Sequence, residues 1–143
     1  MLTESTTLEC NCDSDDRQTW TVPEQIARAV RDFQHESTGH CPKAVSVVLS
    51  EDMLVITLHE ALTTGEKALS RNPDGAAKVQ EFHRQLFASA SGSLLREINR
   101  ISGRQVREAT DQVGPPTGAI VHAFTTGTMV QIFLLIPDTP LNI

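Results

Sequence analysis

The chain has 143 residues and a mass of 15.7 kDa, the size of one ordinary domain. Its 18 acidic residues outnumber its 12 Lys and Arg residues, which gives a formal net charge of −6. This balance excludes the basic footprint of a nucleic-acid-binding protein and disfavours unaided binding to an anionic membrane. Much of the acidity lies in residues 1–22, where Arg17 is the only basic residue.

The first predicted element is a helix that begins after Thr21. Residues 1–20 are rich in Ser, Thr, Asp and Glu and have little to bury, which predicts a flexible acidic tail. Thr21 and Glu24 have the spacing of a capping box, and Pro23 suits a first helical turn. The helix is expected to end at Gly39, and its apolar stripe consists of Ile26, Ala27, Val30 and Phe33.

Two β-branched, apolar segments come next in the sequence. They are Ala44–Leu49 and Met53–Leu58, and Ser50–Asp52 between them predicts a tight hairpin. Because both faces of these segments are apolar, we expect central strands covered by helices, not a hairpin open to water.

Two helices are predicted to follow this hairpin. Thr63 and Glu66 again have capping-box spacing and predict a short helix through Leu69. Asn72 is the expected cap of a long helix that ends at Gly103, with an apolar stripe of Val79, Phe82, Leu86, Ala90, Leu94, Ile98 and Ile101. Small residues in its middle, Ser89–Ser93, predict a bend or a close approach by another element.

The C-terminal part is predicted to complete the sheet. Arg104–Asp111 has the pattern of a strand. Ala119–Thr125 and Thr128–Ile136 read as a second hairpin, with Gly127 at its turn.

The order of these elements predicts a single α+β domain over residues 21–137, followed by a short C-terminal tail at 138–143. We expect a two-layer sandwich: a mostly antiparallel sheet of four to five strands, packed by one long and one shorter helix.

Signals for targeting, metal and catalysis are weak. The N-terminus does not have the pattern of a signal peptide, and the longest apolar run, Met129–Ile136, is too short to span a membrane. Three cysteines without framework spacing fit reduced thiols, so we expect a cytoplasmic protein without direct membrane insertion, metal or cofactor. His83 is interpreted as a partly buried structural histidine, because the sequence shows no acidic group to orient it as a base, and no enzyme is expected.

The candidate binding residues lie at two helix ends. Thr63, Glu66 and Lys67 surround a helix N-terminus, which either binds an anion or is simply capped by its own side chains. Arg100, Arg104 and Arg107 lie near the end of the long helix, where they either receive an acidic partner or a phosphate or form a solvated face.

Four stretches resemble a bacterial family once called a domain of unknown function and now named for the C subunit of a sodium-translocating, membrane-potential-generating system. They are Thr38–Pro42, Ser50–Val55, Leu62–Leu69 and Ile101–Val106. The resemblance covers about residues 23–136. It implies a small soluble protein that works with a membrane cation or bicarbonate uptake system, and it supplies no catalytic residues to carry over.

The resulting hypothesis is a non-catalytic accessory module that forms a homodimer and binds a protein partner, such as a membrane transport subunit, through helix ends and a sheet edge. It does not bind nucleic acid. The alternative is a small-molecule or anion sensor that uses Thr63–Lys67 and Arg100–Arg107 as its pocket. An accessory module predicts a flat surface, a sensor predicts an apolar cleft with a few polar groups, and an enzyme predicts a histidine with a hydrogen-bonded acidic group.

Overall fold

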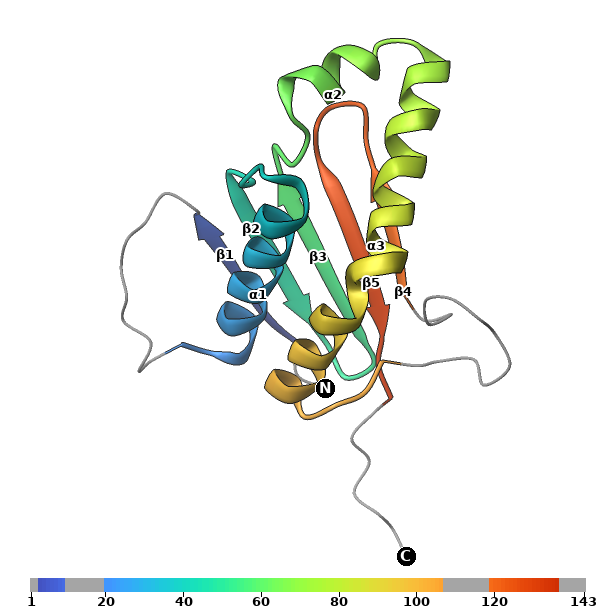
Figure 1. Ribbon diagram of the computed structural model, residues 1–143. Coiled ribbons are helices and arrows are strands. Elements are labelled where there is room, and N and C mark those ends of the chain that lie inside the picture. The colour runs from blue at the N-terminus through green and yellow to red at the C-terminus, as the bar shows by residue number, and fades with distance from the viewer. Residues whose placement is uncertain (1–2, 10–19, 107–118, 137–143) are drawn as a thin grey trace, which may run out of the picture.

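The computed structural model describes residues 3–9, 20–106 and 119–136 (Figure 1). The elements follow in the order β1 (Glu4–Glu9), α1 (Val22–Thr38), β2 (Ala44–Leu49), β3 (Met53–His59), α2 (Thr64–Leu69), α3 (Pro73–Ser102), β4 (Ala119–Ala123) and β5 (Met129–Leu134). The predicted α+β class is confirmed.

The sheet has five strands in the order β1-β2-β3-β5-β4, and every neighbouring pair is antiparallel. Two hairpins, β2–β3 and β4–β5, meet at a central seam in which Met53 lies opposite Leu134 and Leu58 opposite Met129. Helices α1 and α3 lie side by side in front of one face of this sheet (Figure 1). The result is the predicted two-layer arrangement.

The helix ends follow the local signals in the sequence. Thr21 caps α1 through a reciprocal capping box, with Glu24 Oε1 accepting the Thr21 N–H at 2.8 Å. Asn72 Oδ1 accepts the Gly75 N–H at 2.8 Å and caps α3. Gly39 and Gly103 end α1 and α3 with φ of 76° and 74°, a conformation that favours glycine.

The N-terminal segment departs from the prediction. Residues 1–20 were expected to form a flexible tail, but Glu4–Glu9 is strand β1, paired with β2. Leu8 lies opposite Val45 and packs against the core. An edge strand needs only one partly buried face, so a largely polar segment can serve as one.

The segment after α3 is only partly described. The predicted strand Arg104–Asp111 is represented by a single bridge between Val106 and Leu135, and residues 107–118 and the predicted tail at 138–143 lie outside the described residues. α3 runs without interruption through Ser89–Ser93.

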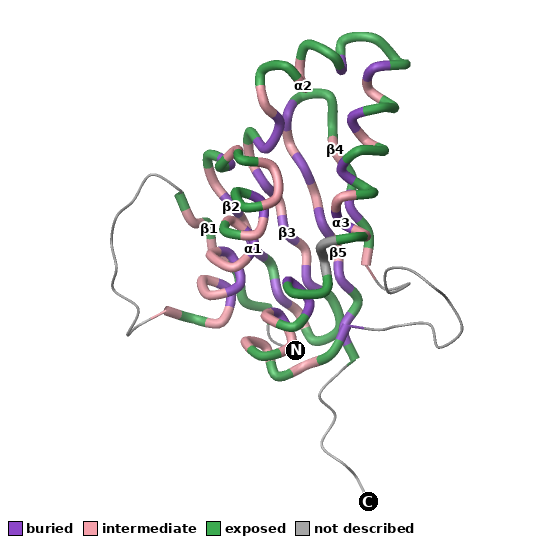
Figure 2. The backbone as a smooth tube through the Cα atoms, viewed as in Figure 1, coloured by how far each residue is buried: buried purple, intermediate pink, exposed green. Residues whose placement is uncertain are grey.

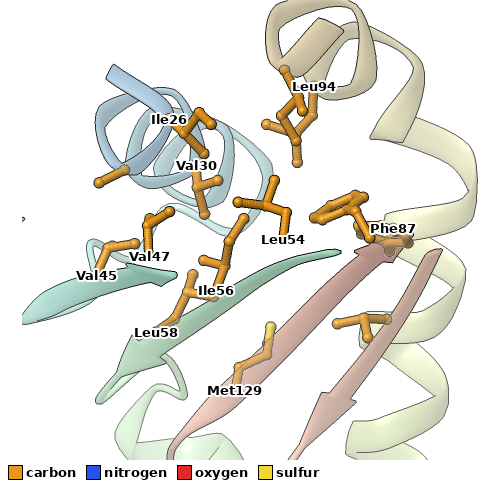
Figure 3. Packing of buried hydrophobic residues seen from close by; sticks show 14 of the residues in the cluster. Ile26, Val30, Val45, Val47, Leu54, Ile56, Leu58, Phe87, Leu94 and Met129 are labelled. Carbon is orange, nitrogen blue, oxygen red and sulfur yellow. The ribbon is translucent and has the colours of Figure 1, made fainter. Parts of the chain in front are cut away.

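The core lies between the sheet and the two long helices (Figure 2). Ile26 and Val30 of α1 point toward Val47 and Ile56 of the sheet, and Phe87 of α3 lies beside Leu54 (Figure 3). Burial of such aliphatic and aromatic side chains is the main favourable term in folding.

The opposite side of the sheet contradicts the expectation that the first hairpin is not open to water. In β3 the residues alternate between buried (Leu54, Ile56, Leu58) and more exposed positions, and β2 shows the same alternation. Within the described ranges, α1 and α3 pack against one face only.

Candidate functional site

We call the side of β2, β3, β5 and β4 that points away from α1 and α3 the open face. Its side chains come from every second residue of these strands. They are Ala44, Ser46, Val48, Met53, Val55, Thr57, His59, Ile120, His122, Val130, Ile132 and Leu134. Strand register aligns Val48, Val55, Ile132 and Ile120 in one row across all four strands.

The open face is apolar and carries no formal charge. None of its twelve described positions holds Asp, Glu, Lys or Arg, and β1 adds Glu9 only at the margin. Val48 and Ile120 are 41% and 55% exposed. At its polar end, His59 Nε2 lies 3.0 Å from Ser46 Oγ, which in turn lies 3.1 Å from Thr7 Oγ1. This surface is therefore an apolar band with a hydrogen-bonded polar margin.

The β4 edge of the sheet is blocked by a side chain of α3. Gln80 Nε2 donates to the Val121 carbonyl oxygen at 3.1 Å, and Gln80 Oε1 accepts the Ala123 N–H at 2.6 Å. The amide thus occupies two of the backbone groups that an added strand would use. Pairing of another strand at this edge, whether from a protein partner or from a second copy of the chain, requires that Gln80 leave.

A cleft of about 340 Å³ lies among the C-terminal end of α1, helix α2 and the first turns of α3. Its lining is mostly apolar, with the Glu66 carboxylate as the acidic group; the residues are Thr38, Thr63, Glu66, Leu69, Lys78, Val79 and Phe82. The close approach of α2 and α3 depends on Gly75, where an added Cβ would lie 1.8 Å from the Leu69 carbonyl oxygen.

Behind this cleft, Glu66 is bonded to His83. Glu66 Oε2 lies 2.6 Å from His83 Nε2, while Oε1 accepts the Thr63 N–H at 2.9 Å. His83 is only 3% exposed. Burial raises the pKa of Glu66, but the bonds from Thr63 and His83 outweigh it and hold the pKa below its usual value. The acidic partner that the sequence did not reveal is thus Glu66, 17 positions earlier in the chain. The histidine with a hydrogen-bonded acidic group that an enzyme predicts is therefore present, but the buried ring of His83 has little access to a substrate.

The predicted cluster Thr63–Lys67 caps α2. This is one of the two interpretations that the sequence left open, the other being an anion site. Thr63 and Glu66 form a reciprocal capping box. Lys67 Nζ lies 3.7 Å from Glu60 Oε1, and its side chain packs over Gly127 at the β4–β5 turn.

Arg100 and Arg104 lie at the other end of α3 from Thr63–Lys67, so they do not form one pocket with that cluster. A helix of 30 residues is about 45 Å long. Arg100 pairs with Glu97 at 2.7 Å. Arg104 Nη1 donates to the carbonyl oxygens of Ser50 and Glu51 at 2.7 and 2.6 Å, so it fastens the β2–β3 turn. Arg107 lies outside the described residues.

Arg100 also borders a hollow that we call the α1–α3 groove. This hollow of about 500 Å³ is lined by Trp20, Gln25, Arg28, Ala29, Asp32, Glu97, Arg100 and Ile101. The Arg28 guanidinium lies 3.8 Å from the centre of the Trp20 ring, in a cation–π contact. Charges of both signs make this groove suited to a polar protein surface.

None of the described helices has the length and apolarity of a membrane span. Likewise, the described His, Cys, Asp and Glu residues form no group of three or more suited to a metal ion.

Fold and surface together define a small α+β domain with an open apolar sheet face. A family model described as the Na⁺-translocating membrane potential-generating system (MpsC) matches residues 19–128. The chain therefore belongs to the MpsC family, and membership implies a role in a membrane potential-generating system. No curated protein and no solved structure matches the chain.

Proposed function

We propose that this chain is a non-catalytic, cytoplasmic accessory module of the membrane potential-generating system, and that it works as a homodimer that binds a protein component of that system. The observation that carries the proposal is the open face. A contiguous apolar surface on a small domain marks a site of association. Its residues Val48, Met53, Ile120 and Leu134 are all more than a third exposed.

The occupant we propose for the open face is a second copy of the chain. Each copy has a net charge of −6, so two copies repel each other over most of their surfaces. The open face lacks formal charge, and two copies can meet there without like-charge contacts. A two-fold axis near Val55 and Ile132, which pair across the central seam, would bring the apolar rows of both copies together.

Face-to-face packing is also favoured over extension of the sheet. The β4 edge is occupied by Gln80, and the β1 edge begins and ends with Glu4 and Glu9, which disfavour pairing of identical acidic edges. Strand spacing and length give the open face an area of about 400 Å² in projection. This is small for a specific interface, so we expect dissociation in the micromolar range.

Back-to-back sheets would leave α1 and α3 on the outside of the dimer. The α1–α3 groove, with Arg28, Asp32, Glu97 and Arg100 along it, then faces away from the two-fold axis in each copy. We propose this groove as the contact for the protein component, such as a membrane transport subunit. The assignment retains the predicted use of helix ends and replaces the predicted sheet edge.

The test is the mass of the purified chain in solution, measured by sedimentation over a range of concentrations. We expect a monomer–dimer equilibrium, and the variant Ile132→Lys should remain monomeric because it places a charge at the centre of the open face. The matched control is Ala77→Lys on the exposed side of α3. A wild-type chain that stays monomeric throughout, or an Ile132→Lys chain that dimerises as well as wild type, would overturn the proposal.

The groove is tested separately by co-expression with the membrane components of the system. We expect the chain to be retained on membranes that contain those components, and Arg100→Glu to reduce this retention without changing the dimer. Retention that is equal for wild type and Arg100→Glu would remove the groove from the contact.

The second candidate function, a small-molecule sensor, is favoured by one observation, the apolar cleft beside Glu66. In this structure the sensor would use that cleft alone, because Arg100 and Arg104 lie at the far end of α3.

A further inference from the structure

We infer that the cleft among α1, α2 and α3 binds a small zwitterion with an apolar body, of the chemical class of the apolar α-amino acids. This site is separate from the open face, so the inference does not depend on dimerisation. It rests on the Glu66 carboxylate at the cleft, on Lys78, whose flexible side chain borders the cleft, on the apolar walls, and on the size of the space.

The negative group of the cleft is the Glu66 carboxylate. The Thr63 N–H and His83 Nε2 hold its two oxygens from two sides, at 2.9 and 2.6 Å. An ionised carboxylate offers about four acceptor sites, so each oxygen can accept one further hydrogen bond. The side chain is 19% exposed and lines the cleft. A fixed, partly desolvated carboxylate of this kind is suited to a ligand ammonium group.

The positive group is the Lys78 ammonium. Lys78 lines the same cleft from α3 and is exposed. Among the described residues it has neither an ion pair nor a hydrogen bond, in contrast to Lys67, which is paired with Glu60. Lys78 is therefore available for the carboxylate of a ligand, and its flexible stem allows it to reach over the cleft.

The walls between these charges are apolar and unusually exposed. Phe82 and Leu69 are 50% and 48% exposed, and Val79 is buried beneath them. Exposed large apolar side chains around a concave surface are typical of a site that is covered when occupied. A volume of about 340 Å³ is near the lower end for ligand sites, which favours a ligand of amino-acid size.

The pair of opposite charges favours a zwitterion over a ligand that carries a single charge. A free anion would meet the Glu66 carboxylate, and a free cation would meet the Lys78 ammonium, so each would be repelled by one of the two groups. A zwitterion presents an ammonium to Glu66 and a carboxylate to Lys78. The apolar body then lies against Leu69, Val79 and Phe82.

The experiment is titration calorimetry of the purified chain with L-leucine and L-phenylalanine. The two half-ligands of leucine, isopentylamine and 4-methylpentanoate, serve as probes that lack one charge. We expect saturable binding of at least one of the amino acids, and binding weaker by about tenfold or more for each half-ligand. No saturation by either amino acid up to about 10 mM, or equal binding of a half-ligand, would overturn the inference.

Three variants locate the site. Glu66→Gln removes the charge and keeps a side chain that can both cap α2 and bond to His83, so the fold is retained. Glu66→Gln and Lys78→Gln should each weaken binding about tenfold or more, while the control Lys67→Gln should bind as wild type. Equal affinity of Glu66→Gln and wild type would contradict the site. Ile132→Lys should still bind the amino acid, which separates a failure of this inference from a failure of the proposed dimer.

Discussion

The two faces of the sheet are built from the same strands and have similar apolar side chains, yet the described helices cover only one of them. Ile56 and Val55 are neighbours in β3; Ile56 is fully buried beneath α1 and α3, whereas Val55 lies on the open face. The alternation of a strand decides which residues share a face, but the rest of the molecule decides what covers it. Apolar strands therefore indicate that a surface will be covered, without showing whether the cover belongs to the same chain.

The sharpest test of this difference compares substitutions at two neighbouring residues of β5 whose side chains lie on opposite faces. Phe133→Ala removes a fully buried ring that packs on Phe87, and we expect unfolding to become easier by about 3–5 kcal/mol. Ile132→Ala, on the open face, should lower the free energy of unfolding of the monomer by much less. Urea denaturation of both variants at the same low protein concentration measures their free energies of unfolding. An equal decrease for the two variants would show that the two faces are equally packed.

A second test concerns the edge where the two faces meet. Gln80→Ala removes both hydrogen bonds to β4. We expect the free energy of unfolding to fall by about 1–3 kcal/mol and hydrogen exchange at the Ala123 amide to become faster. The control is Gln85→Ala, whose side chain bonds to Glu81 on the exposed side of α3. Unchanged exchange at Ala123 would show that Gln80 does not close the edge.

A smaller effect is expected from truncation on the open face itself. Val55→Ala should lower the free energy of unfolding of the monomer by about 1 kcal/mol or less, because none of the described helices packs over this side chain. The same variant should raise the dissociation constant of the dimer several-fold. Sedimentation at several concentrations measures the second effect, and a dissociation constant equal to that of wild type would argue against Val55 as part of the interface.

The stability of the protein should also depend on pH through Glu66, which lies at the cleft on the helix side of the molecule. The pKa of Glu66 is lowered in the fold, so its ionised form stabilises the protein above the ordinary glutamate pKa of 4.5. This contribution is lost as the pH falls through the lowered pKa. We expect the melting temperature of wild type to fall more steeply below pH 4.5 than that of Glu66→Gln. Parallel curves for the two proteins would contradict this role.

The smallest effect is expected at the outer surface of α3, which belongs to neither face of the sheet. Arg100 and Glu97 form an exposed pair at 2.7 Å that raises the pKa of Arg100 and lowers that of Glu97. Exposed ion pairs contribute little to stability. Arg100→Ala should leave the urea midpoint unchanged, and a clear shift would show that the α1–α3 groove contributes to the fold as well as to binding.

Local signals predicted most of the fold correctly. Capping boxes, glycine stops and the two hairpin turns depend on residues a few positions apart, and the bounds of α1, β2 and α3 follow from them. Strand β1 was missed because its burial is slight and comes from the pairing of Leu8 with a distant strand.

The candidate site was less predictable, because its contacts join residues far apart in the sequence. Glu66 was recognised as a capping residue, but a cap uses only Oε1, and the free Oε2 allows the bond to His83. Nothing in the local pattern around Gln80 indicates that its amide will bond to β4. The sequence left Arg104 as part of either a binding surface or a solvated face, whereas in the structure its Nη1 donates to the Ser50 and Glu51 carbonyl oxygens.

The central seam between β3 and β5 also has a consequence for the rate of folding. The two hairpins are local and can form early, but the seam pairs Met53 with Leu134, and α2 and α3 lie between them in the chain. Contacts between segments so far apart close late and slow the folding of a sheet. Until the seam forms, β3 and β5 are both unpaired apolar edges. The interval before closure is thus the period when this chain is most exposed to aggregation.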